Sequence, residues 1–84
     1  MKFSKKGTVG DSIVGKRVIA KMNDLCFYDD PSWQDKDVAG TVDAREGFII
    51  DGRVMVNGFL QYKVYNSKGQ AFYITASKKY VRVK

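Results

Sequence analysis

Histidine is absent from this chain of 84 residues, and cysteine, proline and tryptophan each occur once. Without histidine the chain lacks the commonest metal ligand and general base. The single thiol, Cys26, cannot form a disulfide within the chain or a cysteine-based zinc site, and it has no imidazole to activate it as a nucleophile. We therefore predict a protein that is not an enzyme and that uses no metal and no cofactor.

Long apolar runs and helical periodicity are missing as well. No stretch approaches the roughly 20 apolar residues that span a bilayer. No window keeps apolar residues at the spacing of an amphipathic helix, and the basic first residues lack the apolar segment of a signal peptide. The sequence predicts no membrane span and no long helix.

Short apolar or alternating segments, separated by turn residues, are present instead. Asn57-Gly58 is a strong signal for a two-residue hairpin turn, because both residues tolerate positive φ and apolar segments flank them. Asp51-Gly52 predicts a bend or bulge. The strands are expected at residues 17–22, 25–28, 38–42, 48–56, 59–65, 70–75 and 80–83. Six or seven short antiparallel strands predict an all-β fold, a small barrel.

The alternation of side chains along residues 59–65 divides that strand into two faces. Tyr62 and Val64 fall on one face, and Gln61 and Tyr65 fall on the other. Only one of these sets is expected to face the core.

Charge is unevenly distributed along the chain, whose net charge is +6. Residues 1–23 hold six basic groups and one acidic group. Residues 24–51 hold two basic and eight acidic groups, and residues 52–84 hold seven basic groups and no acidic group. Two interpretations remain open. Either the acidic segment pairs with the basic strands in the fold, or the basic groups form a face that binds a polyanion such as teichoic acid or nucleic acid.

Aromatic residues are numerous: five Phe, five Tyr and one Trp. A barrel this small is filled by its own side chains, so a ligand must bind on its outside. Eleven rings exceed what such a core encloses, and partly exposed rings offer flat faces and hydroxyls to sugars or peptides. The candidate ligand-binding residues are Tyr28, Trp33, Tyr65, Tyr73 and Tyr80, with Asp29 and Asp30 as candidates for holding a free amine.

Structural roles compete with binding roles at each of these positions. A strand tyrosine is often an ordinary half-buried barrel residue. Trp33, flanked by polar residues, equally suits a loop anchor that folds back onto the core. The aspartates of residues 29–37, the longest expected loop, equally suit caps of a solvated turn.

From Val38 onward the order of features resembles a bacterial SH3 domain (SH3b-like), the small barrel appended to many peptidoglycan hydrolases and phage lysins. The matching features are Gly40-Thr41-Val42, the 43–47 turn, the 48–56 strand, Asn57-Gly58, Gln61-Tyr62-Lys63-Val64, the 66–69 turn, Tyr73-Ile74-Thr75 and Ser77-Lys78-Lys79-Tyr80-Val81. The segment from Tyr73 to Val81 also resembles the endings of lactobacillar surface-protein modules. Residues 25–31 depart from the family pattern, which puts the shape of the first long loop in doubt.

The resemblance implies an SH3-like barrel at residues 14–84, and we expect residues 1–13 to be a loosely ordered leader. It implies a non-catalytic module that binds peptidoglycan or another cell-wall polymer and targets a tethered hydrolase or surface protein to the Gram-positive envelope. Such a module is extracellular, monomeric and part of a longer exported or phage-released protein that includes a catalytic domain. Tyr73 and Tyr80 match the aromatic strand and the closing tyrosine of the family.

Two other binding functions are compatible with the residues. A basic barrel with exposed aromatics also describes nucleic-acid-binding domains of the OB type. The segment Leu25-Cys26-Phe27-Tyr28-Asp29 is similar to a strand of SH3 domains that bind proline-rich peptides, although the tandem tryptophans of those domains are absent. We favour a wall polymer over nucleic acid as the partner.

Overall fold

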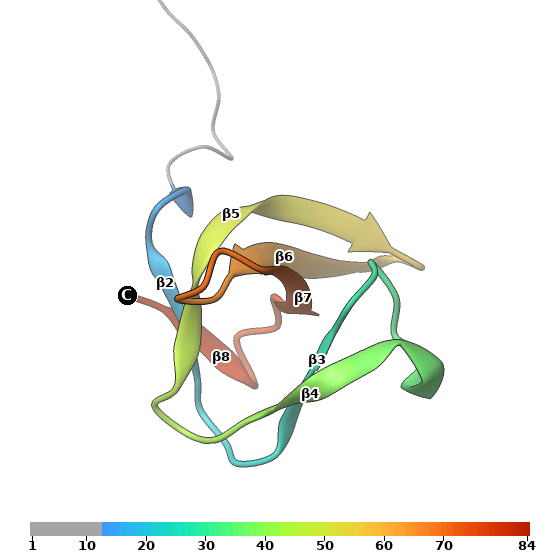
Figure 1. Cartoon of the computed structure of the whole chain (residues 1–84), viewed down its shortest axis with the longest axis horizontal. Coiled ribbons are helices and arrows are strands. Elements are labelled where there is room, and N and C mark those ends of the chain that lie inside the picture. Colours follow the sequence, from blue (N-terminus) through green and yellow to red (C-terminus); the bar gives the residue numbers. More distant parts are fainter. Residues whose placement is uncertain (1–12) are drawn as a thin grey trace, which may run out of the picture.

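The computed structural model of the protein describes residues 13–84. In that range the strands, labelled as in Figure 1, are β2 (Arg17–Ala20), β3 (Leu25–Tyr28), β4 (Val38–Val42), β5 (Gly47–Val56), β6 (Phe59–Tyr65), β7 (Ala71–Thr75) and β8 (Val81–Val83), and the 3-10 turn η2 spans Asp35–Asp37. The prediction of a leader at residues 1–13 lies outside the described residues except for Ile13, which packs against the core.

The seven strands of residues 13–84 form one antiparallel sheet in the order β4-β3-β7-β6-β5-β2-β8. The sheet curls around itself, so that β3 and β4 face β5 and β6 across the molecule (Figure 1). The prediction of a small all-β fold with six or seven antiparallel strands is confirmed. The described part of the chain contains no helix with the length and apolar character needed to span a membrane.

The turn signals in the sequence act where they were expected. Asn57 and Gly58 have φ angles of 50° and 85° and connect β5 to β6, as a two-residue hairpin turn requires. The pairing of β5 with β6 shifts register between Ile50 and Gly52, which is the predicted bulge. The bulge bends the long strand β5, and it is this bend that carries the β5–β6 hairpin away from β2 (Figure 1).

The core is small and consists mainly of branched aliphatic side chains. Its buried members are Val18, Ala20, Val42, Phe48, Ile50, Val64, Ile74 and Val81. Phe27 meets Phe48 and Phe72 edge to face, with ring centroids 5.1 Å and 4.9 Å apart. Gly40 leaves room for this cluster, because a Cβ at that position would lie 3.0 Å from the Phe27 ring.

Most aromatic rings are only partly enclosed by this core. Of the ten aromatic residues in the described range, Phe48 alone is buried, and Phe59 retains 69% of its exposure. The expectation that the chain has more rings than its interior encloses is therefore confirmed for residues 13–84.

We predict that Gly47→Ala destabilises the fold, because a Cβ on Gly47 would collide with the backbone carbonyl of Val18 in the neighbouring strand β2. Overpacking against rigid backbone typically costs about 2 kcal/mol or more. Gly52→Ala is the matched control: a Cβ there meets no atom within 4 Å, so we expect a change within about 0.5 kcal/mol. Urea unfolding of the two variants measures both values, and equal stabilities would contradict the account of Gly47.

Candidate functional site

The loop at residues 29–37 folds back over the sheet and is fastened there by two side chains. The indole Nε1–H of Trp33 donates to the carbonyl of Val56, at the end of β5, over 2.8 Å. The amide Nε2 of Gln61, in β6, donates to the carbonyl of Ser32 over 2.6 Å. The loop is therefore attached to the β5–β6 hairpin, which lies more than twenty residues later in the chain.

The burial of Gln61 corrects the expectation that side chains on only one face of strand β6 (Phe59–Tyr65) are buried. Val64 is buried on the core face of β6, as expected of one of the two sets, but Gln61 on the opposite face is also fully buried. The reason is the docked loop, which covers this face of β6 and accepts the hydrogen bond from Gln61. Within the described residues the amide Oε1 of Gln61 has no hydrogen-bond partner.

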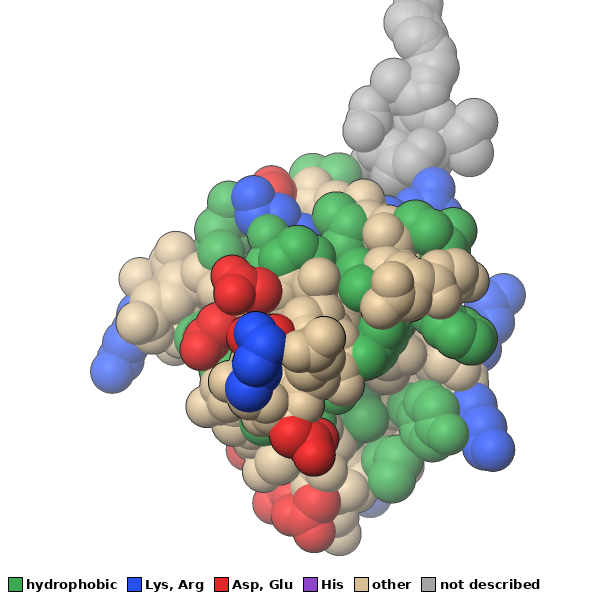
Figure 2. All heavy atoms as spheres, turned by 90° about the vertical axis from the view of Figure 1, so that its right-hand side faces the viewer, with side chains coloured by type: hydrophobic (Ala, Val, Ile, Leu, Met, Phe, Trp, Pro, Cys, Tyr) green, Lys and Arg blue, Asp and Glu red, His purple; other side chains and the backbone are tan. Residues whose placement is uncertain are grey.

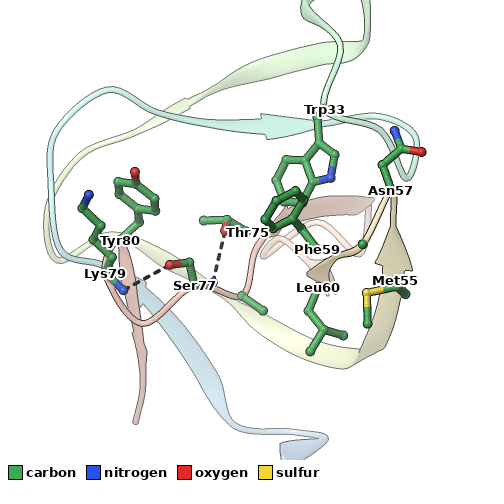
Figure 3. Close-up of a pocket in the computed structure, with 11 residues that line it drawn as sticks. Trp33, Met55, Asn57, Phe59, Leu60, Thr75, Ser77, Lys79 and Tyr80 are labelled. Carbon is green, nitrogen blue, oxygen red and sulfur yellow. Dashed lines mark hydrogen bonds between the residues drawn. The ribbon is translucent and has the colours of Figure 1, made fainter.

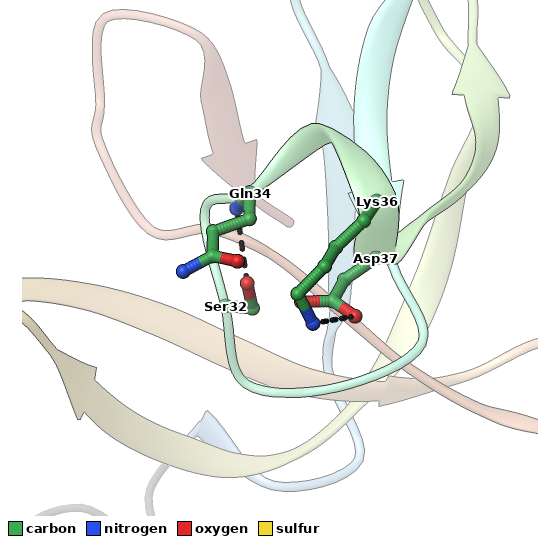
Figure 4. Close-up of polar contacts among 4 residues, drawn as sticks. All are labelled: Ser32, Gln34, Lys36 and Asp37. Atoms are coloured by element: carbon green, nitrogen blue, oxygen red, sulfur yellow. Dashed lines mark hydrogen bonds and ion pairs between the residues drawn. The ribbon is translucent and has the colours of Figure 1, made fainter.

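Polar contacts within the loop hold its shape (Figure 4). The backbone N–H of Gln34 donates to Ser32 Oγ over 2.9 Å, and Lys36 Nζ pairs with the carboxylate of Asp37 at 3.2 Å. The backbone N–H of Asp29 donates to the carbonyl of Asp37 over 2.8 Å and closes the base of the loop. Hydrogen bonding from Ser32, followed by that from Lys36, holds the pKa of Asp37 below its ordinary value of 3.8.

A large groove of about 780 Å³ lies between this loop, the tip of the β5–β6 hairpin and residues 76–80. Its lining is Trp33, Met55, Asn57, Gly58, Phe59, Leu60, Thr75, Ala76, Ser77, Lys79 and Tyr80. Figure 3 shows Trp33 and Phe59 at one end of the groove and Tyr80 and Lys79 at the other. The groove is thus mainly apolar and aromatic, with a few hydroxyl and amide groups, as is typical of small-molecule and sugar sites.

A second, smaller groove of about 310 Å³ adjoins the first and shares Trp33, Thr75 and Tyr80 with it. Tyr28 lines it and meets Trp33 edge to face, with ring centroids 5.9 Å apart. Burial is the main cause that raises the pKa of Tyr28 above 10.0, and the nearby Cys26 and Asp35 add to it.

Residues 76–80, which we call the 76–80 turn, form the wall of the large groove opposite Trp33 and Phe59. The N–H of Ala76 donates to the carbonyl of Leu60 over 3.0 Å, and the N–H of Tyr80 donates to the carbonyl of Ser77 over 3.0 Å. Lys79 Nζ lies 5.6 Å from the centre of the Tyr80 ring, close enough for a cation–π contact. The wall therefore presents a ring and a cation together.

The structure brings together three of the predicted ligand-binding residues, Tyr28, Trp33 and Tyr80, in the two adjoining grooves. All three are partly exposed. Trp33 combines two of the roles considered for it, since it anchors the loop and lines both grooves.

The other predicted residues lie outside these grooves. Tyr73 stands opposite Tyr28 in the pairing of β3 with β7 but is not among the lining residues. Tyr65 lies in a separate depression beside Arg17 and Phe48. Asp29 and Asp30 are exposed on the loop and line neither groove.

Of the eleven residues that line the large groove, only Trp33 and Tyr80 were predicted as ligand-binding residues, and the large apolar residues among those missed are Met55, Phe59 and Leu60. They retain 64%, 69% and 39% of their exposure, and they flank the Asn57-Gly58 turn. Their position in the sequence could have identified them, because they flank the predicted Asn57-Gly58 turn. Large apolar residues at the tip of a hairpin are too far from a small core to be buried in it.

Comparison with known proteins relates the chain to a cell-wall enzyme. Over 73 residues it is 51% identical to the N-acetylmuramoyl-L-alanine amidase BlyA of Bacillus subtilis (strain 168). The match covers 86% of this chain and 20% of the length of the amidase. No family model matches the chain, and no solved structure matches it. The chain is therefore similar to a small part of a peptidoglycan hydrolase.

We predict that Asp37→Asn weakens the loop and changes the pH dependence of stability. A carboxyl whose pKa is lower in the folded than in the unfolded state stabilises the fold above its unfolded pKa, and this contribution is lost as the pH falls through the folded pKa. The wild-type chain should therefore lose more stability than the variant between about pH 5 and about pH 3. Urea unfolding followed by the fluorescence of Trp33, the single tryptophan, measures this, and parallel pH profiles would contradict the role of Asp37.

Proposed function

We propose that the chain is a non-catalytic module that binds a cell-wall polymer and holds a catalytic domain of the same parent protein on the wall of a Gram-positive bacterium. The similarity to part of an amidase supports a wall-associated role. The observation that carries a binding role is the apolar, aromatic groove at the tip of the β5–β6 hairpin.

The lining of the groove suits the repeating sugar and peptide units of peptidoglycan. Sugar rings present C–H faces that stack on partly exposed rings such as Trp33 and Phe59. Thr75, Ser77 and Asn57 add polar groups that bind sugar hydroxyls or peptide amides. Because tethering to a catalytic domain raises the effective concentration of the module near its polymer, modest affinity is sufficient.

Two kinds of hydrolytic site, a metal centre and a cysteine nucleophile, have no support among residues 13–84. No group of three or more His, Cys, Asp or Glu side chains in that range is placed to hold a metal ion. Cys26 lies half-buried in β3, and the chain has no histidine to activate it. We therefore assign the cleavage of the cell wall to another domain of the parent protein, and we assign to this chain the role of holding that domain on the wall.

We expect the purified chain to pellet with Bacillus subtilis sacculi, and Phe59→Ser to weaken that binding. Removal of an exposed ring that contacts the ligand costs about 1 kcal/mol, which corresponds to several-fold in affinity. The ring is 69% exposed, so the variant should fold normally, as circular dichroism and thermal unfolding check.

The matched control is Val14→Ser, which removes an apolar side chain that is 47% exposed and lies outside the grooves. Its affinity for sacculi should equal that of the wild-type chain. Wild-type protein that stays in the supernatant would refute the proposed function. Equal binding by the Phe59 and Val14 variants would refute the assignment of the groove.

A further inference from the structure

Figure 2 shows acidic side chains clustered in the middle and at the bottom of one face, with a basic side chain among them. Within residues 13–84 the ion pairs are Lys36 with Asp37 and Lys63 with Asp51. Only the second joins the acidic middle of the chain to a basic segment, so internal pairing neutralises few of the basic groups.

Three basic residues line one depression of about 280 Å³ on the other side of the 76–80 turn from the large groove. They are Lys21, just after β2, Lys78 in the turn and Arg82 in β8. Ala76 belongs to both the groove and this basic depression, so the two sites adjoin. None of the three cations takes part in an ion pair with a described acidic residue.

Strand pairing and hydrogen bonds bring together the three segments that carry these cations. Strand β2 pairs with β8, with Ile19 opposite Arg82, and the N–H of Lys21 donates to the carbonyl of Tyr80 over 2.8 Å. Lys21 Nζ donates to the carbonyl of Lys78 over 2.9 Å, which places its charge at the rim of the turn. Like charges that line one depression repel one another, and a bound anion relieves that repulsion.

We propose that the basic depression binds the phosphodiester groups of an anionic wall polymer, namely a teichoic acid, while the large groove binds peptidoglycan. This inference rests on the proposed function and assigns a second ligand class to a second site. Arg17 and Lys84 extend the positive surface along the same pair of strands, with the N–H of Lys84 bonded to the carbonyl of Arg17. A group of several cations matches the repeated charges of a polymer better than it matches a single free anion.

Nucleic acid also carries phosphodiesters, but the lining of the depression favours a polymer without bases. Proteins that bind single-stranded nucleic acid combine cations with exposed aromatic rings on which bases stack. The one ring in the lining, Tyr62, is packed against the hydrophobic core. The depression therefore offers three cations but only one half-buried ring on which a base could stack.

The test uses three changes that remove the charge and keep a polar side chain: Lys21→Gln, Lys78→Gln and Arg82→Gln. Binding to poly(glycerol phosphate) is measured by calorimetry at about 50 mM and about 200 mM salt. We expect the wild-type affinity to fall steeply with salt, and the triple variant to bind at least about tenfold more weakly at low salt. The control triple variant, Lys16→Gln, Arg53→Gln and Lys68→Gln, has the same net charge as the first variant but changes exposed residues outside the depression, so it should bind like the wild-type chain.

Sacculi with and without teichoic acid separate this inference from the proposed function. The Lys21, Lys78 and Arg82 variant should bind native sacculi more weakly than wild type but bind acid-stripped peptidoglycan equally well. If wild type binds stripped peptidoglycan but not poly(glycerol phosphate), or if the two triple variants lose affinity equally, the inference fails and the proposed function stands. Tighter binding to a single-stranded oligonucleotide than to poly(glycerol phosphate) would also overturn it. Absence of wild-type binding to either kind of sacculus defeats the proposed function itself.

Discussion

The attachment of the 29–37 loop to the β5–β6 hairpin is the constraint on which both grooves depend. Two hydrogen bonds, from Trp33 to Val56 and from Gln61 to Ser32, hold the loop against the sheet. Without them the indole would lose its fixed position, and the wall shared by the two grooves would open. The buried Gln61 reinforces the attachment, because undocking would leave polar groups without their partners until water replaced them.

The second constraint is the size of the core, which explains why the groove is aromatic. A sheet of seven short strands encloses a handful of aliphatic side chains and Phe48, and its other rings remain at the boundary. At the hairpin tip the strands extend past the core, so no other part of the fold covers the side chains of Met55 and Phe59, which stay exposed. Exposed apolar area of this kind is unfavourable in water, and contact with a ligand removes that cost.

Local chemistry explains which features could be predicted from the sequence. The hairpin turn at Asn57-Gly58 depends on the positive φ that both residues adopt, and the bulge lies between Ile50 and Gly52; both features were predicted. The burial of Gln61 depends on a loop 29 residues away, which no local pattern indicates. Tyr65 was grouped with Tyr80 because both are surplus rings, yet the curl of the sheet puts them in different depressions. The number of aromatic residues thus predicts that a binding site exists, but only the tertiary fold shows which of them form it.

The basic residues have an alternative role to polyanion binding, which is to prevent the edge of the sheet from pairing with another chain. This role accounts for only some of them. Strand β8 is at one end of the sheet order, and charged side chains on such a strand discourage pairing with another chain. That role explains Arg82 and Lys84, but Lys21 follows β2 and Lys78 belongs to the 76–80 turn, so neither lies on the edge strand. Their convergence on Arg82 concentrates charge at one point of the surface, next to the groove. Protection of an edge needs no such convergence, whereas recognition of a polyanion does.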